Sequence, residues 1–138
     1  MTNVAEIFDS MEYGPAPEDK KPALEWIKAR DGKFTPFING KFVAADKAAW
    51  FPAINPATGE KLGQVMQAAQ KDVDAAVKAA RAAQEEWVSL PAFERAKYLY
   101  ALSRVVQKRA RLFAVLESLD NGKTIRETRA IDVPLAAR

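Results

Sequence analysis

The residue types that this chain lacks limit its chemistry more than the types that it contains. Its 138 residues include no cysteine and no histidine, so it can build neither a disulfide nor a Cys/His zinc site. A Ser–His or Cys–His nucleophile pair is excluded for the same reason. Any chemistry within these residues must therefore use carboxylates, lysine, tyrosine or serine, and otherwise it lies elsewhere.

Two pairs of neighbouring carboxylates are the first candidates for acid–base chemistry. Glu85 and Glu86 are adjacent, and Asp72 and Asp74 are two residues apart. Residues at these spacings do not face each other on a helix, so neither pair is arranged as a general acid and base. We interpret the glutamates as a solvated helix face and the aspartates as anions that complement a helix dipole.

Gly122-Lys123-Thr124 matches the end of a phosphate-binding P-loop, but the rest of that motif is missing. Glu117 stands where the loop needs its first glycine, and a helical pattern precedes it where the loop needs a strand. We therefore expect a helix that ends at Gly122 and a new helix after it.

Charge and hydropathy favour neither nucleic acid nor a membrane as a partner. The net charge is only +3. A basic group in one predicted helix has few aromatic residues near it apart from Phe113, so stacking on nucleic-acid bases lacks support. This group contains Arg104, Lys108, Arg109 and Arg111. No apolar run approaches the roughly 18 residues of a membrane span. The acidic start of the chain has no secretory h-region, so we expect a cytoplasmic protein.

The first half of the chain predicts an arm followed by two β-hairpins. Glycine and prolines between residues 12 and 22 predict a loose arm, with a short amphipathic helix over 23–29. In Phe37-Ile-Asn-Gly-Lys-Phe-Val43 the Asn-Gly pair favours a type I′ turn between apolar strands. A second hairpin, 50–54 with 61–67, surrounds a Pro- and Gly-containing turn. Such short strands are marginal alone, so they are expected to join a larger sheet.

From residue 70 onward the apolar residues recur with the period of an α-helix. One face of the first helix carries Val73, Ala76, Val77, Ala80, Ala83 and Trp87. Ser89 is the expected N-cap of a second helix, and the basic residues at 108–111 mark an expected break in it. Pro134 is expected to kink or restart the last helical stretch. Trp87 and Phe113 are predicted to belong to a core rather than to a cofactor site.

Six short stretches occur in a fixed order along residues 36–138. They are Phe37-Ile-Asn-Gly-Lys-Phe-Val, Ile54-Asn-Pro-Ala-Thr-Gly-Glu, Asp72-Val-Asp-Ala-Ala-Val-Lys-Ala-Ala-Arg-Ala-Ala, Trp87, Glu94-Arg-Ala and Leu116-Glu-Ser-Leu-Asp-Asn-Gly-Lys-Thr. Each is short, but the ordered series resembles the N-terminal portion of an aldehyde dehydrogenase. The segments Ile7–Pro15 and Ile131–Arg138 resemble the family 16 branch.

This resemblance implies an α/β fold of which the chain holds only a part. The expected parts are an N-terminal arm over 1–35, short β-hairpins over 36–68, and three or more α-helices over 70–138. The helices would belong to an incomplete Rossmann-like cofactor domain, and the hairpins to the sheet that the family uses in oligomerisation. The expected partners are therefore the remainder of the chain's own dehydrogenase domain and further copies in a homo-oligomer.

The resemblance also implies the NAD(P)-dependent oxidation of an aldehyde to a carboxylic acid. In that family a cysteine thiolate attacks the aldehyde, hydride passes to nicotinamide, and a glutamate activates water. The cysteine, the Pro-Trp-Asn-Phe-Pro cofactor segment and the glutamate motif are all absent here and are expected downstream. We therefore assign no catalytic or cofactor-binding residue, and expect NAD or NADP only in the full-length protein and no activity from this chain alone.

One family feature falls within these residues. A structural monovalent cation is implied at Ala53 and Ile54, through backbone carbonyls, and at Asp120, through its carboxylate. Alternatively, Asp120 only closes a helix end near Gly122.

Two other functions remain open from the sequence. A freestanding, non-catalytic helical interaction or scaffold module would unfold cooperatively and expose little apolar surface. A weak nucleic-acid binder would show salt-dependent binding. The family 16 branch includes members thought to lack the nucleophile, so a scaffold role is compatible with the resemblance.

Overall fold

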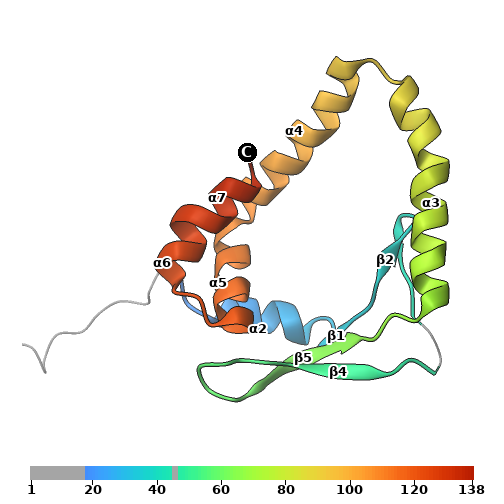
Figure 1. Ribbon diagram of the computed structural model, residues 1–138. Coiled ribbons are helices and arrows are strands. Elements are labelled where there is room, and N and C mark those ends of the chain that lie inside the picture. Colours follow the sequence, from blue (N-terminus) through green and yellow to red (C-terminus); the bar gives the residue numbers. More distant parts are fainter. Residues whose placement is uncertain (1–17, 45–46) are drawn as a thin grey trace, which may run out of the picture.

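The computed structural model describes residues 18–44 and 47–138. The two longest helices, α3 and α4, meet at one apex and enclose an open frame, with the strands at the foot of α3 and a helical group at the foot of α4 (Figure 1). The elements in order are α2 (Lys21–Lys28), β1 (Lys33–Phe34), β2 (Phe37–Ile38), β3 (Lys41–Phe42), β4 (Trp50–Ile54), β5 (Lys61–Met66), α3 (Gln70–Ser89), α4 (Ala92–Lys108), α5 (Ala110–Asn121), α6 (Ile125–Glu127), the π-helix η1 (Thr128–Asp132) and α7 (Val133–Ala136).

Both predicted hairpins are present, and a strand that was not predicted completes one sheet. β2 pairs with β3, while β5 is the central strand of a three-stranded sheet in the order β1-β5-β4. β4 is antiparallel to β5, but β1 runs parallel to it. In the turn between β2 and β3, Asn39 and Gly40 both have positive φ, 50° and 79°, which confirms the geometry expected of Asn-Gly.

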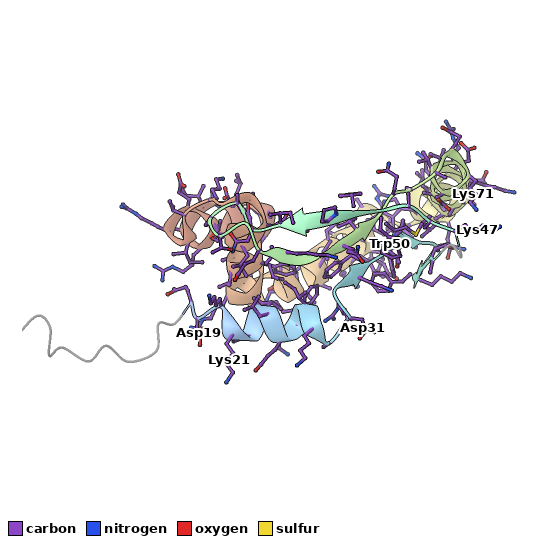
Figure 2. All side chains as sticks on the ribbon, turned by 90° about the horizontal axis from the view of Figure 1, so that it is seen from below. Asp19, Lys21, Asp31, Lys47, Trp50 and Lys71 are labelled. Atoms are coloured by element: carbon purple, nitrogen blue, oxygen red, sulfur yellow. The ribbon has the colours of Figure 1, made fainter. Side chains whose placement is uncertain are left out.

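Within the N-terminal stretch, residues 18–35 contain one helix and one strand. The short amphipathic helix is confirmed as α2, which begins at Lys21 and buries Ala23 and Ile27. Its Trp26 ring stacks on Phe34 of β1, with 5.8 Å between ring centroids. Helix α2 contacts both α5 and β5, and Figure 2 shows Asp19 and Asp31 near its two ends. The stretch Ile7–Pro15 lies outside the described residues.

The start of α4 differs from the prediction. Ser89 is the last residue of α3, and its hydroxyl donates a hydrogen bond to the Glu86 carbonyl at 2.7 Å. Pro91 precedes α4 instead, with an extended ψ of 148°. A proline fits there because the N–H that it lacks would have no partner in the first helical turn.

The other helix boundaries agree with the sequence pattern. The break at the basic residues lies at Arg109, between α4 and α5, and Gly122 ends α5 with a φ of 76°. The final stretch is interrupted by the π-helix η1 before α7 restarts with Pro134 in its first turn. The Ser103 hydroxyl donates to the Ala137 carbonyl and so joins α4 to the end of the chain.

The hydrophobic core lies where α2, α5, η1 and the sheet meet, and it is small. Among the described residues, its buried apolar members are Ala23, Ile27, Met66, Ala114, Val115, Val133 and Ala137. Trp87 is 37% exposed and Phe113 is 40% exposed, so the prediction that both lie in a core is wrong for this chain. Helix α4 buries no residue, because its main contacts within the described residues are with α5 and α7, which leave most of its apolar side chains exposed.

The α/β class is confirmed, with the strands preceding a run of helices. Across residues 18–44 and 47–138, no helix combines the length and the apolar character needed to cross a membrane.

Candidate functional site

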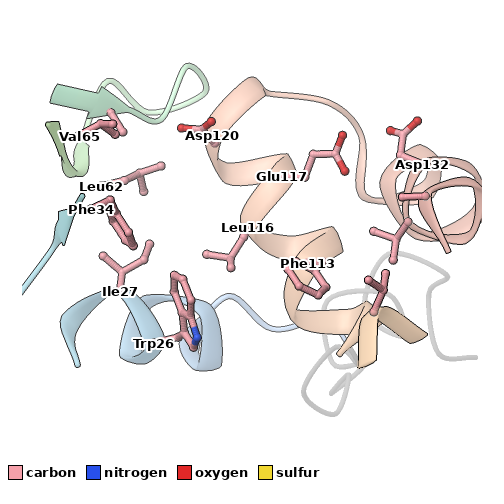
Figure 3. Close-up of a pocket in the computed structure, with 14 residues that line it drawn as sticks. Trp26, Ile27, Phe34, Leu62, Val65, Phe113, Leu116, Glu117, Asp120 and Asp132 are labelled. Carbon is pink, nitrogen blue, oxygen red and sulfur yellow. The ribbon is translucent and has the colours of Figure 1, made fainter. Parts of the chain in front are cut away.

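A cavity of about 660 Å³ lies between the sheet, α2, α5 and the C-terminal helices (Figure 3). Its walls are mostly apolar, and three carboxylates join them. The lining residues are Trp26, Ile27, Phe34, Ala53, Leu62, Val65, Val106, Phe113, Leu116, Glu117, Asp120, Asp132, Val133 and Ala136. Of the buried apolar residues, Ile27 and Val133 line this cavity.

The three carboxylates of this cavity differ in their surroundings. The Asp132 carboxylate accepts a hydrogen bond from the Lys123 ammonium at 2.6 Å, and this bond raises the pKa of Lys123. The negative charges of Glu117 and Glu127 raise it further. The Asp120 side chain forms no hydrogen bond or ion pair with the residues that the structure describes, and in Figure 3 its carboxylate lies on the side of the sheet. Asp120 is thus the carboxylate most available to a cation.

The turn between β4 and β5 is held by Asn55. The Oδ1 atom of this buried residue accepts a hydrogen bond from the Ala57 N–H at 2.9 Å, and its carbonyl accepts one from the Gly59 N–H at 2.8 Å. The sequence pattern gave no signal for this role beyond the favourable chemistry of Asn in turns.

The end of α5 rests against this turn. A Cβ atom added to Gly122 would lie only 2.8 Å from Cγ of Pro56. Two stretches that carry the family resemblance, Ile54–Glu60 and Leu116–Thr124, therefore meet in space although they are distant in the chain. Asn121 Oδ1 also accepts a hydrogen bond from the Lys123 N–H at 2.8 Å, so Gly122 and Asn121, rather than Asp120, shape the helix end.

A bulge in the sheet lies beside the predicted cation ligands. Ala53 pairs with Gly63 and Ile54 pairs with Lys61, which leaves Leu62 as an extra residue between them. Bulges leave backbone groups unpaired by the ladder. Ala53 and Leu62 line the same cavity as Asp120, whereas Ile54 is not among its lining residues.

In the described parts of the chain, no three acidic side chains gather to hold a metal ion. A cation at Asp120 would therefore depend on backbone carbonyls, which is the oxygen chemistry expected of it.

Sequence reasoning missed several residues of this cavity. Glu117 could have been found, because it lies one helical turn before Asp120 on α5. Trp26, Phe34 and Asp132 come from other elements, and their convergence has no local signal.

Comparison with known proteins agrees with the geometry. Residues 42–138 match the profile described as "Aldehyde dehydrogenase family". HpcC from Thermus thermophilus is 35% identical, with a TM-score of 0.77 over 85% of this chain and 23% of that chain. The NAD+ complex of aldehyde dehydrogenase from Bacillus cereus is 36% identical, with a TM-score of 0.73 over 80% of this chain and 23% of that chain.

Lactaldehyde dehydrogenase from Escherichia coli is 31% identical, with a TM-score of 0.73 over 76% of this chain and 22% of that chain. The chain thus spans less than a quarter of the length of these solved relatives. Family profile, identity and fold point the same way, and the chain belongs to the aldehyde dehydrogenase family.

Proposed function

We propose that this chain is the N-terminal segment of an NAD(P)-dependent aldehyde dehydrogenase that oxidises an aldehyde to a carboxylic acid, and that it is inactive alone. The main support for this proposal is the close approach of Gly122 to Pro56. It brings together two motifs of the family resemblance, and neither of them contains a catalytic residue. The segment's role is then structural: it builds one wall of the enzyme. NAD or NADP would accept the hydride in the full-length protein and would be held by other residues.

The exposed faces of α3 and α4 support the same proposal. Helix α4 buries no side chain, and its large apolar residues Leu99 and Leu102 are 61% and 62% exposed. Burial of such surface is the main driving force of folding, so these faces need a cover. We propose the remainder of the same dehydrogenase domain as that cover.

Further parts of the proposal rest on the sequence resemblance. They are a division into an arm over 1–35, hairpins over 36–68 and helices over 70–138, membership of the family 16 branch, a homo-oligomer and a cytoplasmic location. Ile7–Pro15 and Ile131–Arg138 support the branch assignment.

A graft tests whether the chain can serve as this segment. Residues 42–138 replace the matching part of the Bacillus cereus enzyme, and NADH formation from NAD+ and an aldehyde is followed by absorbance. We expect the graft to be active and the isolated 138-residue chain to produce no NADH. A graft that fails to fold, beside an isolated chain that unfolds cooperatively, would instead favour a freestanding helical scaffold module.

A cation test addresses the site that we propose at Ala53, Ile54 and Asp120. We expect K+ or Na+ to raise the melting temperature of the graft, and Asp120→Asn to abolish that increase. Glu117→Gln is the matched control, because it removes a carboxylate from the same cavity without touching the proposed ligands. An equal cation effect in both variants would contradict the site.

A further inference from the structure

Two Asn-Gly-Lys tripeptides in this chain have the same sequence but different structures. They are Asn39-Gly40-Lys41, between β2 and β3, and Asn121-Gly122-Lys123, at the end of α5. An asparagine before a glycine can lose ammonia, because the glycine has no Cβ to obstruct the approach of its nitrogen to the asparagine side chain. The local sequence favours this reaction equally at both places, so a difference between them must come from the fold.

The reacting groups of Asn121 and Gly122 are both hydrogen-bonded at the end of α5. The Gly122 N–H donates to the Ser118 carbonyl at 3.1 Å, and the Asn121 Oδ1 atom accepts from the Lys123 N–H at 2.8 Å. Both bonds must break before the Gly122 nitrogen can attack. Gly122 also lies against Pro56, which restricts any rearrangement of this helix end.

The corresponding groups of Asn39 and Gly40 are open to reaction. Both residues are exposed, and neither the Asn39 side chain nor the Gly40 N–H forms a hydrogen bond with the described residues. A Cβ added to Gly40 would meet nothing within 4 Å. No neighbouring atom therefore obstructs an attack by the Gly40 nitrogen.

The turn at Asn39 also belongs to a weak element. Strands β2 and β3 have two residues each and form a sheet of their own, in which Phe37 pairs with Phe42 and Ile38 with Lys41. A lone two-stranded hairpin is marginally stable in water, so the backbone at Asn39 can rotate at little cost. Helix α5, in contrast, has twelve residues and is anchored by buried side chains.

We propose that Asn39 is a site of spontaneous deamidation and that the fold protects Asn121 from the same reaction. The Gly40 nitrogen forms a bond to Cγ of Asn39, and the bond between Cγ and Nδ2 breaks. The Gly40 N–H proton leaves with the Nδ2 group as ammonia, and a cyclic imide remains. Water then opens the imide without any oxidation or reduction. This inference does not depend on the proposed enzymatic function.

The two products of imide opening differ in their effect on the hairpin. Cleavage at Cγ gives aspartate at position 39, which accepts the positive φ of 50° found there. Cleavage at the backbone carbonyl gives isoaspartate, whose extra main-chain methylene breaks the pairing of Ile38 with Lys41 across the turn. The contact of the Phe37 and Phe42 rings, with 5.1 Å between centroids, is then lost. So is the contact of β2 with the foot of α3 (Figure 1).

Peptide mapping by mass spectrometry, during incubation of the 138-residue chain at mildly alkaline pH, tests the proposal. Because two hydrogen bonds must break at Asn121 and none at Asn39, we expect Asn39 to react about tenfold faster in the native chain. In concentrated urea the two rates should become equal. Equal rates in the native chain would overturn the proposal. A difference that persists in urea would overturn it too, since the fold would then not be its cause.

Nuclear magnetic resonance tests the effect on the hairpin. Asn39→Asp is the matched control, because it carries the charge of the product without lengthening the main chain. Cross-peaks between the Phe37 and Phe42 rings should be present in the native chain and in this variant. They should be absent from the isoaspartate fraction, which is separated by chromatography and identified by enzymatic carboxyl methylation. Cross-peaks that persist in that fraction, or that Asn39→Asp already abolishes, would contradict the opening of the turn by isoaspartate.

Discussion

Replacing Gly122 with alanine tests the contact on which the proposed function rests. The φ of Gly122 is +76°, and its added Cβ would lie 2.8 Å from Cγ of Pro56. A left-handed conformation costs an L-residue about 1–2 kcal/mol, and forcing apart a packed contact adds about 1–3 kcal/mol. We therefore expect Gly122→Ala to lower the free energy of unfolding by about 2–5 kcal/mol.

Gly59→Ala is the matched control. Its φ of +74° is nearly the same, but an added Cβ would meet nothing within 4 Å. This variant should lose only the backbone part, about 1–2 kcal/mol. Urea unfolding followed by circular dichroism measures both losses, and Pro56→Ala should recover part of the larger one. Equal losses for the two glycine variants, to within about 0.5 kcal/mol, would refute the reasoning.

Three further predictions follow from other contacts. Because the hydrogen bond to Asp132 raises the pKa of Lys123 above its ordinary 10.5, this pair stabilises the fold below that pH and the gain is lost as pH rises through the folded value. The urea midpoint of the native chain should thus exceed that of Lys123→Met near neutral pH and converge with it in strong alkali, and a constant difference would contradict this. Thr128 is fully buried, with its hydroxyl 3.1 Å from that of Ser118, so Thr128→Val should cost about 1–3 kcal/mol and added Ser118→Ala should recover part of the loss. A double variant no more stable than Thr128→Val would exclude that coupling. The uncovered faces of α3 and α4 predict that the 138-residue chain raises ANS fluorescence and that the active graft does not. Equal fluorescence from the two proteins would contradict this expectation.

Local chemistry accounts for the parts of the fold that were predicted correctly. The turn at Asn39-Gly40, the end of α5 at Gly122 and the break near Arg109 each depend on a few neighbouring residues. A positive φ or a helix end is decided within one turn of chain, so a sequence pattern is enough to find it.

The remaining features depend on residues that are far apart in the chain. An added Cβ on Gly63 would lie 2.7 Å from the Gly32 carbonyl oxygen, and nothing near Gly63 indicates that approach. The apolar periodicity around Trp87 identified a face but not what covers it, which explains the wrong core assignment. Ala53 and Asp120 were singled out by resemblance to a family, because no local pattern links a strand end to a helix 67 residues later.

The parallel pairing of β1 with β5 has a consequence for how the chain folds during synthesis. Lys33 pairs with Gln64, so β1 emerges from the ribosome well before its partner exists. At about 5–20 residues per second, the wait lasts roughly 2–6 s, whereas β4 and β5 meet across a short turn. The β4–β5 hairpin is therefore the template, and β1 adds to it afterwards, carrying α2 onto the sheet. Helix α2 and strand β1 are therefore synthesised before the hairpin but take their places in the fold after it.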